Sequence, residues 1–213
     1  MSRFEARAFL TLVLVTAIGS APVAFAAVGE KDHPDWPCVQ RKVVTLTSTQ
    51  IWDGPPTDDI KDWSNDAELA KLVPGLISRR VPLDEAKASI KALVEKLPQA
   101  SRDETMKRLF AGVLSRINDE RTSVISGVER FQRRQKTRAD ELERQSSEIV
   151  KLKELAKDDT SRKKLDEAEE KYKWDTRVFQ ERQQNIPLAC EIPTLIEQRA
   201  FELGREIRTY MSK

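Results

Sequence analysis

Two cysteines, Cys38 and Cys190, are the residues of this 213-residue chain best suited to covalent chemistry. They lie far apart in the sequence and form no C-x-x-C motif, which disfavours a catalytic redox pair. In an oxidising compartment two thiols persist as a disulfide, and two cysteines allow only one pairing. The pattern therefore predicts a disulfide between Cys38 and Cys190, with two unrelated buried thiols as the alternative.

The single histidine, His33, has no second metal ligand close by in the sequence. A metal site needs several converging ligands, and a catalytic histidine needs a nucleophile to serve. The sequence also lacks a glycine-rich phosphate loop, a G-x-S-x-G motif and a dinucleotide fingerprint. We therefore predict no metal, no cofactor and no catalytic residue, and interpret His33 as a surface or packing residue.

Carboxylates are abundant, and pairs of them can serve acid–base catalysis. On exposed helices, however, they more often pair with lysine or arginine, as Glu167 would with Lys171 four residues later. No pair lies where the pattern would bury it, so we interpret them as solvated. The groups considered are Asp58 and Asp59 in a proline-rich loop, and Glu167, Glu169 and Glu170 on a predicted helix.

A run of cations without an intervening acid is the most distinctive charged feature. It is a candidate patch for a phosphate, a lipid headgroup or an acidic partner. The alternative is a solvated face matched by acids on a neighbouring helix, such as Glu181. The run consists of Arg130, Arg133, Arg134, Lys136 and Arg138.

The first 26 residues have the three parts of a secretory signal. Arg3 and Arg7 precede an apolar run at residues 8–18, and Ala-Phe-Ala at 24–26 is a small-x-small cleavage site. The apolar run is about 11 residues long, whereas crossing a bilayer takes roughly 20. We expect cleavage after Ala26 and a periplasmic protein without stable membrane insertion; an uncleaved anchor is the alternative.

Composition narrows the remaining possibilities. Removing the signal leaves about 187 residues, which fits one domain or one domain with an appendage. The mature net charge is about +1, so electrostatics favours neither nucleic acid nor an acidic membrane surface. Charged residues make up 34% of the chain and there are only seven glycines. That combination is typical of long solvated helices.

Residues 27–64 are rich in tryptophan and proline, and prolines at this density prevent a continuous helix. Thr47 to Gln50 matches a capping box, which predicts a short helical turn at 46–52. We interpret 27–64 as an extended segment lying along the helices and fastened by Trp36, Trp52 and Trp63. An aromatic ligand site is the alternative.

Residues 65–213 have helical periodicity throughout and form the predicted helical domain. A first helix at about 66–72 would end at Pro74-Gly75, and a second would span 83–97. A capping box at Ser101–Glu104 would start a helix from 102 to about 156. A turn capped by Asp159, Thr160 or Ser161 leads to a helix at about 161–185, ended by Pro187. Pro193 would open a last helix at 194–212, with Cys190 in the link between the two prolines.

These lengths predict an all-α architecture with a helical-bundle base and a projecting arm. The return path through 161–212 is about as long as the outgoing helix, and short connections make neighbouring helices antiparallel. The apolar stripe is broad at 106–131 but thin at 132–156, which is enough for one coiled-coil partner. We therefore place an antiparallel two-helix arm at about 132–185, and the disulfide where arm meets base.

Two sets of residues resemble known families. The first set resembles small exported bacterial proteins without an assigned function. It consists of the motif Asp-Trp-Pro-Cys ending at Cys38, the motif Cys-Glu-Ile-Pro starting at Cys190, and residues 109–112 and Arg121 between them. That resemblance implies a shared fold. Residues 46–50 are also similar to the L-T-x-x-Q pattern of the Spy-like periplasmic chaperones, which are helical cradles for unfolding clients. That pattern appears once here, whereas it usually appears twice in those chaperones.

Taken together, the sequence predicts a non-enzymatic periplasmic interaction or scaffold protein that presents helical surfaces to a protein partner. A chaperone-like binder of unfolded clients is the second hypothesis, and it requires an exposed apolar concavity. An enzyme is a third hypothesis, which the missing motifs disfavour. The oligomeric state stays open, because a thin coiled-coil stripe can pair within or between chains.

Overall fold

The computed structural model describes residues 33–212 and places no β-strand among them. The predicted all-α class is thereby confirmed, while the predicted signal peptide lies outside the described residues. In chain order the helices are α1 (Ser48–Ile51), the short 3-10 helix η1 (Trp63–Asn65), α2 (Ala67–Ile77), α3 (Leu83–Lys96), α4 (Gln99–Leu155), α5 (Asp159–Gln183) and α6 (Ile186–Thr209).

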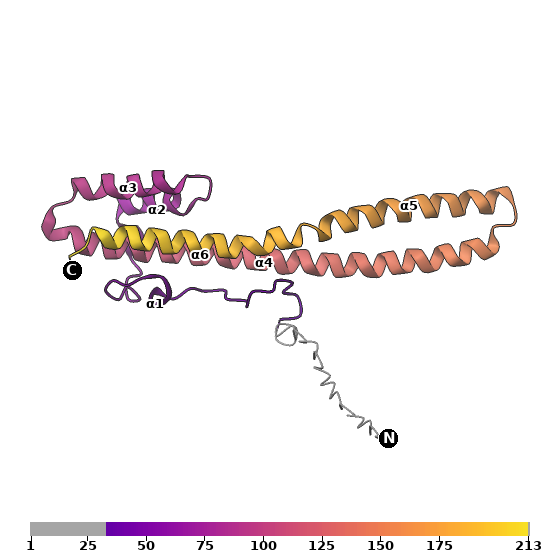
Figure 1. Cartoon of the computed structure of the whole chain (residues 1–213), viewed down its shortest axis with the longest axis horizontal. Coiled ribbons are helices and arrows are strands. Elements are labelled where there is room, and N and C mark those ends of the chain that lie inside the picture. Colours follow the sequence, from indigo (N-terminus) through magenta and orange to yellow (C-terminus); the bar gives the residue numbers. More distant parts are fainter. Residues whose placement is uncertain (1–32, 213) are drawn as a thin grey trace, which may run out of the picture.

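α4 spans the length of the molecule, and α5 and α6 run back along it one after the other (Figure 1). α2 and α3 lie beside α4 and α6 at one end and form the base with them. The N-terminal segment, residues 33–64, runs along the opposite side of α4 and α6 and contains α1. The far half of α4 pairs with α5 alone and forms the arm.

α4 has 57 residues, which at about 1.5 Å per residue gives a length of about 85 Å. It begins at Gln99 with Pro98 as its N-cap residue, three residues before the predicted start. The predicted capping box at Ser101 was therefore wrong, since the Ser101 hydroxyl donates to the Pro98 carbonyl from inside the first turn. Proline suits this boundary because the first amides of a helix have no intrahelical acceptor.

α6 corrects the prediction for the second cysteine. The helix starts at Ile186 and continues through Pro193, so Cys190 lies within it and not in a link. Pro187 sits in the first turn, where its missing amide costs nothing. Pro193 lies inside the helix and is buried, and packing there outweighs the backbone hydrogen bond that it cannot donate.

α2 also extends through a proline that was predicted to stop it. Asp66 caps the helix by accepting from the amides of Glu68 and Leu69, and the helix runs on past Pro74 to Ile77. Val73 and Leu76, on either side of that proline, are fully buried. Their burial favours continuing the helix more strongly than the proline opposes it.

The core lies in the base, between α2, α3, the first half of α4 and α6. Trp52 of the N-terminal segment stacks on Phe110 of α4 with ring centroids 4.1 Å apart, and its indole donates to the Pro55 carbonyl. Trp63 packs against the same core, so the predicted packing role is confirmed for both tryptophans. The largest fully buried side chains are Phe110, Leu69, Leu76, Ile90, Met106, Leu109, Ile117, Ile125, Ile196, Leu203, Ile207 and Val73.

The arm is an antiparallel helix pair, as the lengths predicted. Lys153 of α4 contacts Glu169 of α5 at 3.0 Å, and Arg138 contacts Asp175 at 3.8 Å. Asp158 caps α5 by accepting from the Ser161 amide, so the predicted cap at 159–161 was misplaced. α5 has no fully buried residue, which makes the arm much thinner than the base.

Between residues 33 and 212, no helix combines the length and the apolar character that a bilayer span requires.

Gly204 of α6 lies where the N-terminal segment meets the core, and its replacement tests that packing. A Cβ there would lie 2.8 Å from the Ile51 carbonyl oxygen and 3.2 Å from the Phe110 ring. We expect Gly204→Ala to lower the unfolding free energy by about 2 kcal/mol in urea denaturation. Gly75→Ala is the control, because a Cβ there meets nothing within 4 Å and should be neutral or stabilise α2 by up to about 1 kcal/mol. Equal effects of the two changes would contradict the close packing at Gly204.

Candidate functional site

The predicted disulfide is present between Cys38 and Cys190, whose Cα atoms lie 5.5 Å apart. Cys38 lies in the N-terminal segment and is half-buried, whereas Cys190 in α6 is 8% exposed. The bridge therefore joins the N-terminal segment to the start of α6, close to where the arm meets the base (Figure 1). We call this region the junction; it comprises residues 33–43, 121–136 and 186–197.

Arg121 of α4 is the buried charge at the junction, with a residue exposure of 2%. Its guanidinium donates to the Pro193 carbonyl of α6 at 2.7 Å and to the Val43 carbonyl of the N-terminal segment at 2.6 Å. Glu197 lies 3.6 Å away and is half exposed. One side chain thus ties three separate parts of the chain together through charge-assisted hydrogen bonds.

Burial lowers the pKa of the Arg121 guanidinium, and Glu197 offsets part of that effect. An arginine side chain nevertheless keeps its proton in proteins, so a positive charge persists inside the junction. Arg121 was named above only as part of a family resemblance, and its role at the junction was not predicted. The available signal was its spacing of four residues from both Ile117 and Ile125, which are buried.

A small cavity of about 70 Å³ lies beside Arg121 and the disulfide. The Trp36 indole donates to the Gln40 carbonyl at 2.7 Å, and both residues line the cavity from the N-terminal segment. Ile125, Cys190 and Pro193 line it from the helices. The N-terminal segment therefore covers apolar side chains of α4 and α6 at this point.

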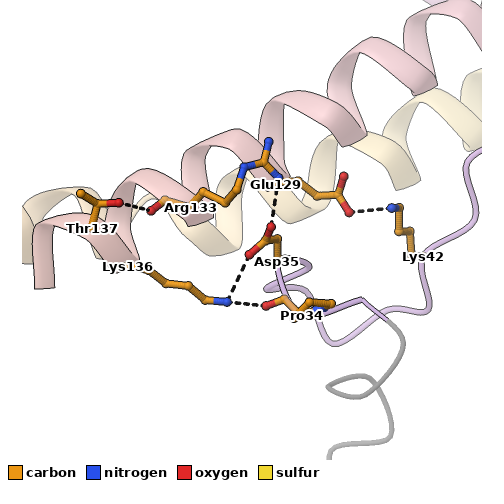
Figure 2. A network of polar contacts seen from close by, with 7 residues as sticks. All are labelled: Pro34, Asp35, Lys42, Glu129, Arg133, Lys136 and Thr137. Atoms are coloured by element: carbon orange, nitrogen blue, oxygen red, sulfur yellow. Dashed lines mark hydrogen bonds and ion pairs between the residues drawn. The ribbon is translucent and has the colours of Figure 1, made fainter. Parts of the chain in front are cut away.

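Two residues of the predicted cationic run, Arg133 and Lys136, lie beside the N-terminal segment (Figure 2). Asp35 contacts Arg133 at 3.1 Å and Lys136 at 3.2 Å, so two of the five cations are matched by a carboxylate. The hydrogen bond from Arg133, together with Lys136, lowers the pKa of Asp35 below its ordinary value. Next to this pair, Lys42 contacts Glu129 at 2.6 Å.

A third member of the run, Arg138, contacts Asp175 of α5. Hydrogen bonds from Lys171 and Gln145, together with the charge of Arg138, lower the pKa of Asp175. Arg130 and Arg134 are exposed and have no carboxylate within 4 Å among residues 33–212. The structure thus leaves a smaller exposed cationic patch than the sequence suggested.

The acids that match the run differ from the expected ones. Glu181 pairs with Arg177 within α5, and Lys171 pairs with Asp175 where Glu167 was expected. The other carboxylates considered are also solvated or used structurally: Asp58 accepts from the Ser48 hydroxyl at 3.0 Å, Glu169 contacts Lys153, and Asp59, Glu167 and Glu170 are exposed.

His33 is exposed, and its carbonyl accepts from the Trp36 amide. The described part of the chain contains no group of three or more histidine, cysteine or acidic residues arranged to hold a metal ion. The histidine thus shares no cluster of potential ligands within residues 33–212.

A second concave feature lies on the other side of the base, where α3 begins beside α6. This groove of about 390 Å³ is open to solvent. Leu195 and Phe201 of α6 remain 49% and 43% exposed on it, and Arg205 lies over the Phe201 ring at 5.7 Å. Leu195 and Phe201 both lie on the helix predicted at 194–212, where no site was expected. The groove is lined by Leu83, Leu195, Gln198, Arg199, Phe201 and Glu202.

Replacing Arg121 tests whether it holds the junction together. Arg121→Met keeps much of the side-chain length but removes the donors to the Val43 and Pro193 carbonyls. We expect the unfolding free energy to fall by about 3 kcal/mol in chemical denaturation. Arg116→Met is the control, because Arg116 is exposed on the same helix and pairs only with nearby Asp119. That change should stay within about 0.5 kcal/mol, and an equally small effect at Arg121 would show that its hydrogen bonds are dispensable.

Comparisons with known proteins add no family assignment. No protein-family model matches the chain, and neither the curated proteins nor the solved structures searched gave a match. The two resemblances drawn from the sequence motifs therefore stay predictions.

Proposed function

We propose that this chain is an exported, non-enzymatic protein that binds a protein partner through its helical base. The observation that carries the proposal is the open groove between α3 and α6, with Leu195 and Phe201 exposed on it. Binding a partner would bury these side chains, and apolar burial is the main driving force of protein association.

Scattered exposed apolar residues are normal on any protein, but these two line one concavity with Leu83. The polar side chains at the edge of the groove are held in place by contacts with α2 and α3. Glu202 pairs with Lys87 at 2.9 Å, and Arg199 donates to the Leu76 carbonyl at 2.7 Å. An apolar patch with a fixed polar rim is the usual anatomy of a protein interface.

The arm offers a second candidate surface. Trp174 of α5 is 64% exposed and stands among mostly charged residues. Tryptophan is enriched among the residues that dominate binding energy at interfaces. The claim for this surface is weaker, because Trp174 lines neither the α3–α6 groove nor the cavity beside Arg121.

Export is supported by two observations. A disulfide between residues 152 positions apart persists most readily in an oxidising compartment. The first 26 residues also carry the pattern of a cleavable secretory signal. We therefore place the mature protein in the bacterial periplasm, which agrees with the lack of a helix apolar enough to cross a membrane between residues 33 and 212.

Site-specific photocrosslinking in the native cell tests the groove. A crosslinking residue at Leu195 or Phe201 should capture a defined partner, whereas one at exposed Val150 on the arm should not. Leu195→Glu should weaken capture from position 201 at least about tenfold, since a charge would have to be buried at the interface. Capture from Trp174 alone would transfer the function to the arm, and no capture from either surface would contradict the proposal. Capture of many aggregating clients would favour the chaperone hypothesis.

Intact-mass analysis of protein taken from its native compartment tests export. We expect a chain that starts near Ala27 and is lighter than the fully reduced form by the two hydrogens lost in the disulfide. Alkylation before reduction should label neither Cys38 nor Cys190. A full-length chain with two labelled cysteines would contradict both the export and the oxidising compartment.

A further inference from the structure

We propose that the Cys38–Cys190 disulfide is a thiol–disulfide exchange site for a dithiol. Its opening releases residues 33–42 from the helices while the remainder of the fold persists. The inference rests on how differently the two parts of the N-terminal segment are held. We call residues 33–42 the latch and residues 43–52 the anchor.

The anchor is fixed by packing and by partly buried hydrogen bonds that do not involve the disulfide. The Leu46 amide donates to Asn118 at 2.8 Å, and Asn118 returns a hydrogen bond to the Leu46 carbonyl at 3.0 Å. Leu46, Ile51 and Trp52 belong to the main core. Arg121 additionally holds the Val43 carbonyl. The anchor therefore has its own means of staying in place.

Apart from the disulfide, the latch is held by polar contacts at the surface and by the half-buried Trp36. Asp35 forms exposed ion pairs with Arg133 and Lys136, and Lys136 also donates to the Pro34 carbonyl at 2.5 Å (Figure 2). Ion pairs that are exposed to solvent contribute little to stability. Lys42 and Glu129 form the one partly buried ion pair, at the latch boundary with the anchor. Val39 is 104% exposed and Gln40 is exposed as well. Breaking the covalent bond removes the main restraint on this stretch.

The two cysteines differ in exposure. Cys38 is half-buried in a stretch without regular secondary structure, next to the fully exposed Val39, whereas Cys190 is buried in α6. A thiolate from outside therefore reaches the Cys38 sulfur more easily, and exchange rates depend on such access. Arg121 lines the same cavity as Cys190, and a nearby cation stabilises the thiolate that departs.

A dithiol acts as the reductant and opens the disulfide in two exchange steps. Its first thiolate forms a bond with the Cys38 sulfur, and the Cys38–Cys190 bond breaks with its electron pair going to Cys190. The second thiolate then attacks the first sulfur of the dithiol and expels Cys38. The dithiol ends as a disulfide, and the protons of its two thiols end on Cys38 and Cys190. The chain gains two electrons, and no metal or cofactor takes part.

Release of the latch changes the surface at the junction. Trp36 and Gln40 currently form one wall of the cavity, and Ile125, Cys190 and Pro193 form the other. When the latch leaves, that second wall and the charge of Arg121 become accessible. The redox state of the disulfide would thus control an apolar surface with a cation at its edge, separate from the α3–α6 groove.

Limited proteolysis of the full oxidised chain tests the release. After treatment with dithiothreitol, trypsin cleavage after Arg41 should accelerate roughly tenfold, because the protease needs a locally detached segment. Cleavage after exposed Lys61, outside the latch, is the internal control and should not change. Circular dichroism should show unchanged helical content. A Cys38→Ser, Cys190→Ser double variant should be cleaved rapidly at Arg41 with or without reductant.

Brief exposure to reduced glutathione, followed by acid quenching and peptide mapping, tests the direction of attack. The early mixed disulfide should be on Cys38. A mixed disulfide found mainly on Cys190 would overturn the direction of attack. An unchanged rate at Arg41, or reduction accompanied by loss of helical content, would overturn the latch and leave the bridge a purely structural link.

Discussion

The apolar stripe of α4 constrains almost everything else in this protein, because every other long helix except α3 packs directly along it. Near its start the stripe is broad and fully buried, with Met106, Leu109 and Phe110 in contact with several elements. After Val128 only Gln135 and Ile149 of α4 are buried. A broad face can hold several helices and a narrow one only a single partner, so one continuous helix produces both a bundle base and a thin arm.

The arm carries a polar residue where a coiled coil would normally place an apolar one. Gln135 is 2% exposed, and its side-chain oxygen has no hydrogen-bond partner among the described residues. A buried polar group lowers the stability of a coiled coil while restricting its register. The arm therefore has a thin interior with an unsatisfied polar group, in contrast to the apolar core of the base.

At the junction, one part of the N-terminal segment is held by non-covalent contacts and the other part by the disulfide. Packing of Trp52 and Leu46 in the core, with the hydrogen bonds of Asn118 and Arg121, fixes residues 43–52. The disulfide holds residues 33–42, where the surrounding ion pairs are mostly solvent-exposed. In the chain-entropy model, closing a loop of about 150 residues stabilises a fold by roughly 5 kcal/mol. The disulfide can thus stabilise the whole fold, while residues 33–42 depend on it more than any other part of the N-terminal segment does.

The sequence by itself determined the all-α class, the order and direction of the helices, the cysteine pairing and the thin arm. Those features follow from periodicity, from lengths that had to match, and from the fact that two cysteines can pair in only one way. Local signals failed at Pro74, Pro193 and Ser101, where propensity predicted a helix boundary. Burial of Val73, Leu76 and Pro193 outweighed it. Tertiary structure alone placed Arg121 against the Val43 and Pro193 carbonyls, Asp35 beside Arg133, and Phe201 on an open groove. These contacts join residues tens of positions apart, and which atoms meet depends on how whole helices pack.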